Sequence, residues 1–454
     1  MHRKRLFATR TRRGRTITST VEPSRPDPNT PDDDDDDDDD HRHSRCAKCR
    51  HPVQLHRHSA AMLNLFVPLL GIPTAYYGTL LGVGFCFYYL FEVVKRPMLV
   101  CANGPFRSFL TERVPLVRNK FWPTLWCFES RAQTIIASLL RSKMMPRIHY
   151  RREILALSDG GEVALDWAEE GCSATSPIVI ILPGLTGASQ AEYIKCLVSS
   201  AKKAGIRCVI FNNRGLGGIG LKTPRTYNAA NSDDLSEVID HVRKLHHNIH
   251  LGATGISMGG LILGNYLAQQ GMKAKEKLKG CFLISVPWNV FAATKNTEEN
   301  YFNLMINKYL AFTLRKNVQR MHNSAEFGMF DVDIEPILKS RTVREFDSHF
   351  TVKQFGYKDV EEYYSNATIH DKLHLIDVPL LCLSAADDPF QPVQAIPLKE
   401  IAETKNVAVV VTSRGGHIGF LEGVWPVKKE QYMGKLFSQF FTALFTNDAN
   451  YQSL

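Results

Sequence analysis

The most constraining stretch of this sequence is Gly-Ile-Ser-Met-Gly-Gly at residues 255–260. An extended run at residues 250–254 precedes it and a helix-like run at residues 261–270 follows, so the serine lies at a turn between a strand and a helix. A serine at such a turn takes a strained backbone conformation, and only glycine fits two residues away on either side. The turn exposes the Ser257 hydroxyl at a helix N-terminus, whose partial positive charge stabilises a developing anion. We therefore predict that Ser257 is a nucleophile.

A serine hydroxyl is a weak nucleophile until a base accepts its proton, and an acid must hold that base in one tautomer. Each partner is expected in the loop after a later strand, in the order serine, acid, base. Asp387 and Asp388 follow an apolar run at residues 380–384. We predict Asp388 as the acid, because it directly precedes a proline in a turn, and Asp387 as a neighbour that stabilises this turn. His417 follows the run at residues 407–412 and is the only histidine after these aspartates, so it is the predicted base.

The negative oxygen that forms during attack on a carbonyl needs two backbone N–H donors. One is predicted to be the amide of Met258, directly after the nucleophile. The other is expected in the glycine-rich loop at residues 183–187, which follows the apolar run at residues 178–182. We predict the amide of Leu185 as this donor, with the amide of Thr186 as the alternative. If the loop has no catalytic role, it is simply a tight turn.

The sequence implies no metal and no organic cofactor. A single Cys-x-x-Cys pair at residues 46–49 lacks a second pair at zinc-binding spacing, and the glycine-rich residues 212–218 lack the spacing of a dinucleotide site. The ten cysteines form no compact framework, so we predict free thiols. The net charge of +9, with basic residues gathered toward the N-terminus, is explained more readily by a membrane surface, or by no specific partner, than by nucleic acid.

The part of the chain that carries these residues is predicted to fold as an open α/β sheet. Hydrophobic content of 44% over 454 residues is enough for a full-size α/β core and additional segments. Eight extended runs alternate with helical stretches, and a hairpin turn joins the first two. The runs lie at residues 152–157, 162–167, 178–182, 207–211, 250–254, 281–286, 380–384 and 407–412. We predict an eight-stranded, mostly parallel sheet in residues 148–454, with a helical lid insertion at about 287–378 over the carboxyl ends of the strands.

Two segments rich in charged residues, 1–58 and 95–147, lie on either side of a long uncharged run. Residues 1–58 are predicted to form a disordered arm, because nine consecutive aspartates at residues 32–40 repel one another and offer nothing apolar to bury. Residues 95–147 are dense in aromatic and basic side chains. Such a juxtamembrane segment either rests on lipid headgroups or packs beneath the main domain.

A membrane anchor is predicted at residues 60–94, because no charged residue occurs from 60 to 91. Its core at about 73–91 is long enough to cross the hydrocarbon of a bilayer as a helix. Pro68 and Pro73 shorten the ideal helix, which leaves a buried core helix as the alternative. The flanking basic residues nearly balance; the strongly basic N-terminus favours a cytosolic tail, whereas the free cysteines favour a cytosolic catalytic domain. We expect a single-pass, type II protein of the endoplasmic reticulum or another internal membrane.

With these residues in place, the chain resembles the α/β-hydrolase superfamily, and within it the membrane-anchored branch of α/β-hydrolase domain-containing proteins 1, 2 and 3, nearest to its phospholipase member. The resemblance covers residue 62 to the C-terminus and rests on short strings. Besides the stretch at 255–260, they are Pro-Thr-Leu-Trp-Cys-Phe-Glu-Ser-Arg at 123–131, Leu-Pro-Gly-Leu-Thr-Gly at 182–187, Asn-Arg-Gly at 213–215, Arg-Glu-Phe-Asp at 344–347, Asp-Asp-Pro at 387–389 and Gly-Gly-His-Ile-Gly-Phe at 415–420. The resemblance implies charge-relay roles for Ser257, Asp388 and His417. It also implies cleavage of an acyl ester of a phospholipid such as phosphatidylcholine, and nothing is carried over to residues 1–57.

We therefore predict a membrane-anchored serine hydrolase whose partners are a lipid substrate and the bilayer, with no nucleic acid. Ser257 would attack an ester carbonyl and form an acyl-enzyme that water then hydrolyses. A carboxylesterase, a monoacylglycerol lipase or an acyltransferase with the same three residues is the alternative among enzymes. A catalytically silent membrane scaffold or lipid receptor is the alternative of another class. The oligomeric state is left open.

Overall fold

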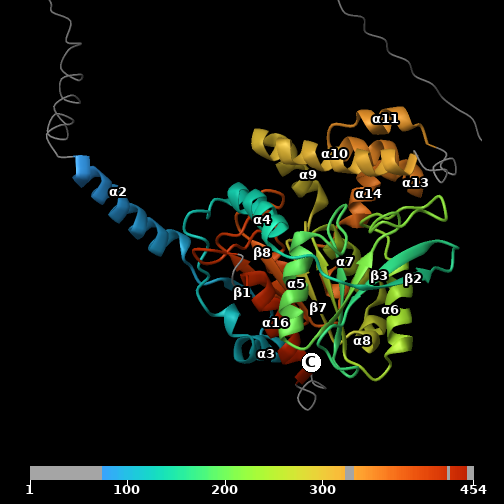
Figure 1. Cartoon of the computed structure of the whole chain (residues 1–454), viewed down its shortest axis with the longest axis horizontal. Helices are drawn as coiled ribbons and strands as arrows, with labels where there is room; N and C mark the ends of the chain where they lie inside the picture. Colours follow the sequence, from blue (N-terminus) through green and yellow to red (C-terminus); the bar gives the residue numbers. More distant parts are fainter. Residues whose placement is uncertain (1–73, 323–331, 427–429, 447–454) are drawn as a thin grey trace, which may run out of the picture. The chain divides into compact units, whose positions relative to one another are not determined.

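The computed structural model describes residues 74–322, 332–426 and 430–446 of the chain (Figure 1). The predicted arm at residues 1–58, the first part of the predicted anchor at residues 60–73 and the Cys-x-x-Cys pair at residues 46–49 lie outside the described residues. Among the residues that are described, no helix has the length and hydropathy needed to cross a membrane. The same residues hold no cluster of ligands for a metal ion.

A single mixed sheet forms the centre of the fold, with the strand order β1-β9-β8-β7-β6-β4-β5-β3-β2. Its strands are β1 (Met98–Val100), β2 (Arg151–Ala156), β3 (Glu162–Ala168), β4 (Ile178–Leu182), β5 (Arg207–Asn212), β6 (Leu251–Ile256), β7 (Gly280–Ile284), β8 (Leu380–Ala385) and β9 (Val407–Thr412). The run from β5 to β9 through β4, β6, β7 and β8 is parallel, and β2, β3 and β1 are added antiparallel at the edges. The predicted mostly parallel sheet is confirmed, and all eight predicted runs are strands.

The ninth strand, β1, is a correction to the eight strands expected from the sequence. It pairs antiparallel with β9 over only three residues, from Met98↔Val411 to Val100↔Val409. Three residues are too few to show a periodicity, and the sequence analysis assigned them to the segment beside the membrane anchor. This segment therefore contributes to the sheet itself.

The parallel strands are apolar throughout because both faces of the sheet are covered. In β4, Ile178, Ile180 and Leu182 point into one hydrophobic core. Val179 and Ile181 point into the other core. This alternation is what a strand buried on both sides requires.

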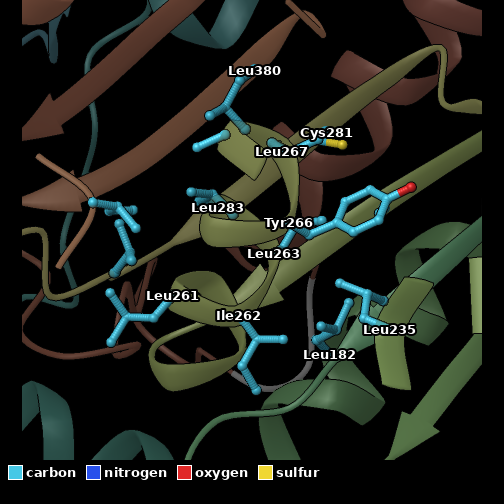
Figure 2. Close-up of a cluster of buried hydrophobic side chains, with 14 of the residues drawn as sticks. Leu182, Leu235, Leu261, Ile262, Leu263, Tyr266, Leu267, Cys281, Leu283 and Leu380 are labelled. Carbon is cyan, nitrogen blue, oxygen red and sulfur yellow. The ribbon is translucent and has the colours of Figure 1, made fainter. Parts of the chain in front are cut away.

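Helices cover each face. On one face lie α3 (Pro105–Arg113), α5 (Glu192–Lys203) and α16 (Tyr432–Thr446). On the other lie α6 (Asp233–Leu245), α7 (Met258–Gln270), α8 (Met272–Lys277) and α15 (Leu398–Glu403). Figure 2 shows how α7 is enclosed: its leucines and Tyr266 lie among side chains from β4, β7, β8 and α6. Because α7 is buried almost all round, its sequence is apolar on every side rather than on one stripe.

The interval between β7 and β8 is helical, as predicted. It contains α9 (Val290–Glu299), α10 (Tyr301–His322), α11 (Ile334–Lys339), α12 (Val343–Phe346), the π-helical turn η4 (Asp347–Thr351), α13 (Val352–Phe355), α14 (Val360–Ala367) and the 3₁₀ turn η5 (Leu373–Leu375). These helices form a small hydrophobic core of their own around Leu314, Val318 and Phe346. Leu185, from the loop after β4, packs against this core. The insertion is thereby attached to the carboxyl ends of the central strands.

The described residues ahead of the first hairpin contain four helical elements besides α3. They are α2 (Thr74–Tyr88), the π-helical turn η1 (Tyr89–Val93) that continues it, the 3₁₀ turn η2 (Pro115–Val117) and α4 (Ser130–Met144). The ring of Phe128 contacts the rings of Phe85, Tyr88 and Tyr89, so the end of α2 is joined to the chain that leads into α4. The eight cysteines in the described residues are free.

Candidate active site

Ser257 lies at the turn between β6 and α7, with φ 51° and ψ −118°. Its backbone N–H donates to the Ile284 carbonyl (2.9 Å), and its carbonyl accepts from the Gly260 N–H (2.9 Å). A non-glycine residue with positive φ is strained, and the surrounding hydrogen bonds hold this one in place. A Cβ at Gly259 would lie 2.5 Å from the Pro183 carbonyl oxygen, so glycine is required where α7 passes β4. The predicted strained turn is present.

The structure brings His417 and Asp388 to this serine. His417 Nε2 lies 3.0 Å from Ser257 Oγ, and His417 Nδ1 lies 2.9 Å from Asp388 Oδ2. Both side chains are buried, at 9% exposed for the histidine and 3% for the aspartate. Because a carboxylate only accepts hydrogen bonds, Nδ1 carries the proton and Nε2 is free to accept from the serine hydroxyl. The three residues therefore form one line of hydrogen bonds.

Asp388 is fixed by the turn that follows it. Its Oδ1 accepts hydrogen bonds from the amides of Phe390 (2.8 Å) and Gln391 (3.3 Å). The Phe390 ring lies 4.2 Å from the imidazole of His417, measured between ring centroids. The turn thus orients the carboxylate and covers the histidine with an apolar ring.

Asp387, the neighbouring carboxyl, points elsewhere. Its Oδ1 accepts from the Gly416 amide (2.9 Å), and its Oδ2 is buried without a hydrogen-bond partner in the part of the chain that the structure describes. Burial raises the pKa of Asp387 to about 7, and the adjacent Asp388 carboxylate adds to the rise, whereas the Gly416 amide and Arg414 oppose it. Of the two aspartates, the structure places only Asp388 against the histidine ring.

The loop after β4 presents three consecutive amides near the serine. The Gly184 amide donates to the Tyr193 hydroxyl (2.9 Å) and the Thr186 amide donates to the Tyr227 hydroxyl (3.1 Å). The amide of Leu185, between them, is the one of the three that is not bound to a tyrosine. This favours Leu185 over Thr186 as the second donor to an oxyanion. Met258, the other predicted donor, is the first residue of α7.

A cavity of about 320 Å³ opens from the serine beneath the helical insertion. Ser257, Met258, Leu185 and His417 all line it, and most of the remaining wall is apolar. Its apolar wall includes Leu261, Val290, Leu310, Leu314, Val318 and Phe346. A cavity of this kind suits an apolar chain attached to the group that reacts at the serine.

One carboxyl group interrupts the apolar wall. Asp347 Oδ1 accepts from the Thr351 hydroxyl (2.7 Å) and Oδ2 from the Tyr364 hydroxyl (3.1 Å). Burial raises the pKa of Asp347 to about 7, against the opposing effect of the two hydroxyl donors. Asp347 ends the Arg-Glu-Phe-Asp string, for which the sequence suggested no role.

The sequence analysis missed the polar side chains behind the histidine. The His417 amide donates to Thr134 Oγ1 (2.9 Å), and the Ile418 amide donates to Ser285 Oγ (3.2 Å). Thr134 lies in α4, far from His417 in the sequence and outside any motif. No chemical pattern in the sequence could have identified it.

The chain is similar to a family of known proteins, to several named proteins and to solved structures. The family described as alpha/beta hydrolase fold matches residues 177–424. Phospholipase ABHD3 of Homo sapiens is 40% identical over 371 residues, covering 80% of this chain and 88% of that protein. Protein abhd-3.2 of Caenorhabditis elegans is 34% identical, covering 73% and 86%, and Monoacylglycerol lipase ABHD2 of Homo sapiens is 26% identical, covering 72% and 80%. Among solved structures, an esterase of Pyrococcus furiosus aligns with a TM-score of 0.42 and 16% identity, covering 65% of this chain and 96% of that one.

The packing at the serine turn gives a first prediction. Gly259→Ala forces a methyl group against the Pro183 carbonyl, where rigid backbone cannot give way. We expect a loss of stability of roughly 2 kcal/mol or more, measured by urea denaturation. Gly104→Ala, at the residue before α3, where a Cβ meets nothing within 4 Å, is the control and should leave stability nearly unchanged. Equal stability of the two variants would show that the close approach at Gly259 is wrong.

Asp387 gives a second prediction, on the pH dependence of stability. Its pKa in the folded chain, about 7, lies above the ordinary value of 3.8, so the folded state binds the extra proton and stability falls as pH rises between these values. Asp387→Asn keeps an oxygen acceptor for Gly416 and carries no charge. We expect its thermal midpoint to exceed that of the wild type by a few degrees at pH 8, with the gap closing toward pH 4. The raised pKa of Asp347 is common to both proteins, so it cancels in the difference.

The exposed Asp240→Asn serves as the control for that experiment, because Asp240 is half-exposed in its pair with Lys277. A difference between Asp387→Asn and wild type that stays constant from pH 4 to pH 8 would contradict the raised pKa.

Proposed function

Because this chain belongs to the α/β-hydrolase fold family, we propose that Ser257, His417 and Asp388 form the catalytic triad of a membrane-anchored phospholipase. The chain is an ester-hydrolysing enzyme. We propose in addition which residues catalyse the reaction, which lipid is cleaved and that the protein is anchored in a membrane. The observation that carries the proposal is the line of hydrogen bonds from Asp388 through His417 to Ser257, with distances of 2.9 Å and 3.0 Å.

The reaction proceeds in two halves. In the first, His417 Nε2 accepts the proton of the Ser257 hydroxyl while Oγ attacks the ester carbonyl, and the protonated imidazole then donates this proton to the leaving alcohol. Asp388 stays ionised, holds the Nδ1 proton and stabilises the imidazolium. In the second half, His417 removes a proton from water, and hydroxide attack on the acyl-enzyme releases the fatty acid and restores the serine.

The negative oxygen of each tetrahedral intermediate is held by the amides of Met258 and Leu185. The Met258 amide opens α7, so the helix dipole adds to its stabilisation. Each such donor contributes about 10²-fold to 10³-fold in rate, because it is already oriented before charge develops.

A phospholipid of the phosphatidylcholine type is the proposed substrate. The apolar cavity beneath the insertion would hold an acyl chain with its ester carbon at Ser257. The relatives named as phospholipases cover most of this chain, which favours a phospholipid. A more distant relative is named a monoacylglycerol lipase, so a monoacylglycerol is the second candidate substrate. Transfer of the acyl group to an alcohol instead of water uses the same residues.

Membrane anchoring near residues 60–94 is part of the proposal. The uncharged run at residues 60–91 and the apolar side chains on the outside of α2 and η1 support it, with Leu80 62% exposed, Leu81 75% and Phe91 68%. The proposed arrangement is single-pass and type II, in the endoplasmic reticulum or another internal membrane. It keeps the cavity next to the lipid that it consumes.

The nucleophile can be tested directly. Ser257→Ala should abolish labelling by a fluorophosphonate probe and lower hydrolysis of phosphatidylcholine by at least ~10³-fold, because no other group can form the acyl-enzyme. Ser438→Ala is the matched control, since among the described residues the Ser438 hydroxyl bonds only to the Lys435 carbonyl of its own helix. Equal labelling of the two variants would refute the assignment of Ser257.

Product analysis with an added alcohol acceptor separates hydrolysis from acyl transfer.

Anchoring is tested by charge. The double variant Leu80→Arg, Leu81→Arg should be released from membranes during alkaline carbonate extraction, because each charge costs about 2.5–3.5 kcal/mol inside a bilayer. Leu245→Arg, at a similarly exposed leucine (52%) at the end of α6, should stay in the membrane pellet. Retention of the double variant would contradict an anchor at this position.

A further inference from the structure

Helix α4 lies directly against the loop that carries His417. The His417 amide donates to Thr134 Oγ1 (2.9 Å) and the Leu421 amide donates to Gln133 Oε1 (2.9 Å). Ser130 Oγ, at the start of the same helix, donates to the backbone carbonyl of Asp387. One face of α4 therefore bonds to the backbone of both loops that present the proposed acid and base.

Arg141, near the end of α4, makes the most unusual of these contacts, because its charged side chain is buried. Its side chain is 1% exposed, and its guanidinium donates to the carbonyl oxygens of Ile418 (2.8 Å) and Gly419. Within the described ranges it forms no ion pair with a carboxylate, and burial lowers its pKa. A buried charge that forms no ion pair is costly, so the hydrogen bonds to these two carbonyls compensate part of that cost, together with the charge of Glu192 at longer range.

The loop needs support from outside because its backbone is strained. Ile418 has φ 61° and Phe420 has φ 43°, which non-glycine residues rarely adopt. Such conformations persist only where neighbouring groups fix them. Gly416 allows the close approach, since a Cβ there would lie 2.6 Å from Thr134 Oγ1 and closer still to the Ser130 carbonyl.

We propose that Thr134 and Arg141 of α4 are positioning residues, which hold the His417 loop so that the imidazole reaches Ser257. This inference rests on the proposed catalytic role of His417. Five residues lead from the end of β9 to the ring, and within them the Gly416 amide, bound to Asp387 Oδ1, and the Ser413 hydroxyl, bound to the Val93 carbonyl, hold the loop to other parts of the described chain. Hydrogen bonds to the amide of His417 and to the next two carbonyls remove the freedom that remains.

The proposal gives a function to a segment outside the recognised domain. Residues 177–424 match the family, whereas α4 at Ser130–Met144 precedes them. The sequence suggested that residues 95–147 only rest on lipid or pack beneath the domain. Here the segment supplies two side chains on which the geometry of the reacting groups depends.

Thr134 separates positioning from packing. Thr134→Val keeps the volume and removes the acceptor of the His417 amide, whereas Thr134→Ser keeps the acceptor and loses a methyl group. With a soluble p-nitrophenyl ester, we expect Thr134→Val to lower kcat about 10-fold or more with KM within about 2-fold, and Thr134→Ser to keep kcat within about 2-fold. If Thr134 served packing alone, the valine variant would be the more active of the two.

Thr111→Val is the matched control, because in the part of the chain that the structure describes the Thr111 hydroxyl bonds only to carbonyls of its own helix, at Arg107 and Ser108. It should retain the wild-type kcat. A valine variant of Thr134 with wild-type kcat would overturn the proposed role of Thr134.

Arg141 has an internal control in Arg243. Both arginines donate through their two Nη atoms to a pair of backbone carbonyls, and both have a buried Nε with no hydrogen-bond partner in the described ranges. Arg243, however, bonds to Ile249 and Lys277, next to the start of β6 and β7 and away from the reacting groups. Lysine cannot bond both carbonyls in the same way. Arg141→Lys should lower kcat about 10-fold or more at unchanged KM, and Arg243→Lys should leave kcat unchanged even if it lowers the thermal midpoint.

His417→Ala distinguishes this inference from the proposed function. If His417→Ala retains activity, the triad itself is wrong. If His417→Ala is inactive while Thr134→Val and Arg141→Lys retain the wild-type kcat, the triad stands and the positioning role of α4 is overturned.

Discussion

The hydrogen bond between His417 and Ser257 depends on three loops that leave the same edge of one sheet. Ser257 follows β6, Asp388 follows β8 and His417 follows β9, and in a parallel sheet these strands all end on the same side. The register of β8 against β9, from Leu380↔Val407 to Ala385↔Thr412, sets how far the two loops can reach toward the serine. A shift of one residue would turn every side chain of a strand to the opposite face, and the two buried cores oppose such a shift.

Much of the fold was predictable, because buried parallel strands leave continuous apolar runs and a strained serine turn leaves glycines. Ser257 and His417 were identifiable from spacing and from the lack of another histidine after the acid. Asp388 needed one more argument, its position before a proline, and the structure puts it rather than Asp387 next to the imidazole. The edge strand β1 was too short to be recognised. The contacts of Thr134 and Arg141 could not be foreseen, because they join a helix to a loop 283 and 277 residues away through backbone atoms that no motif records.

Asp387 and Asp388 show how environment separates two identical side chains. Asp388 accepts two backbone amides and the imidazole N–H, which together satisfy a carboxylate. Asp387 accepts one amide, and its other carboxylate oxygen is buried without a hydrogen-bond partner among the described residues, with Arg414 Nη1 4.0 Å away, so burial favours the neutral form. Two full negative charges side by side in this buried turn would repel, and the raised pKa of Asp387 relieves that repulsion near neutral pH.

Leu185 belongs to two parts of the molecule at once. Its side chain packs against the small core of the helical insertion, and the same residue lines the cavity beside the serine and is the proposed second oxyanion donor. An acyl chain long enough to push the insertion outward would therefore also pull the proposed oxyanion donor away from the carbonyl. The length of the acyl chain would then affect the rate of the chemical step as well as the strength of binding. A substrate with too long an acyl chain would bind well and still turn over slowly.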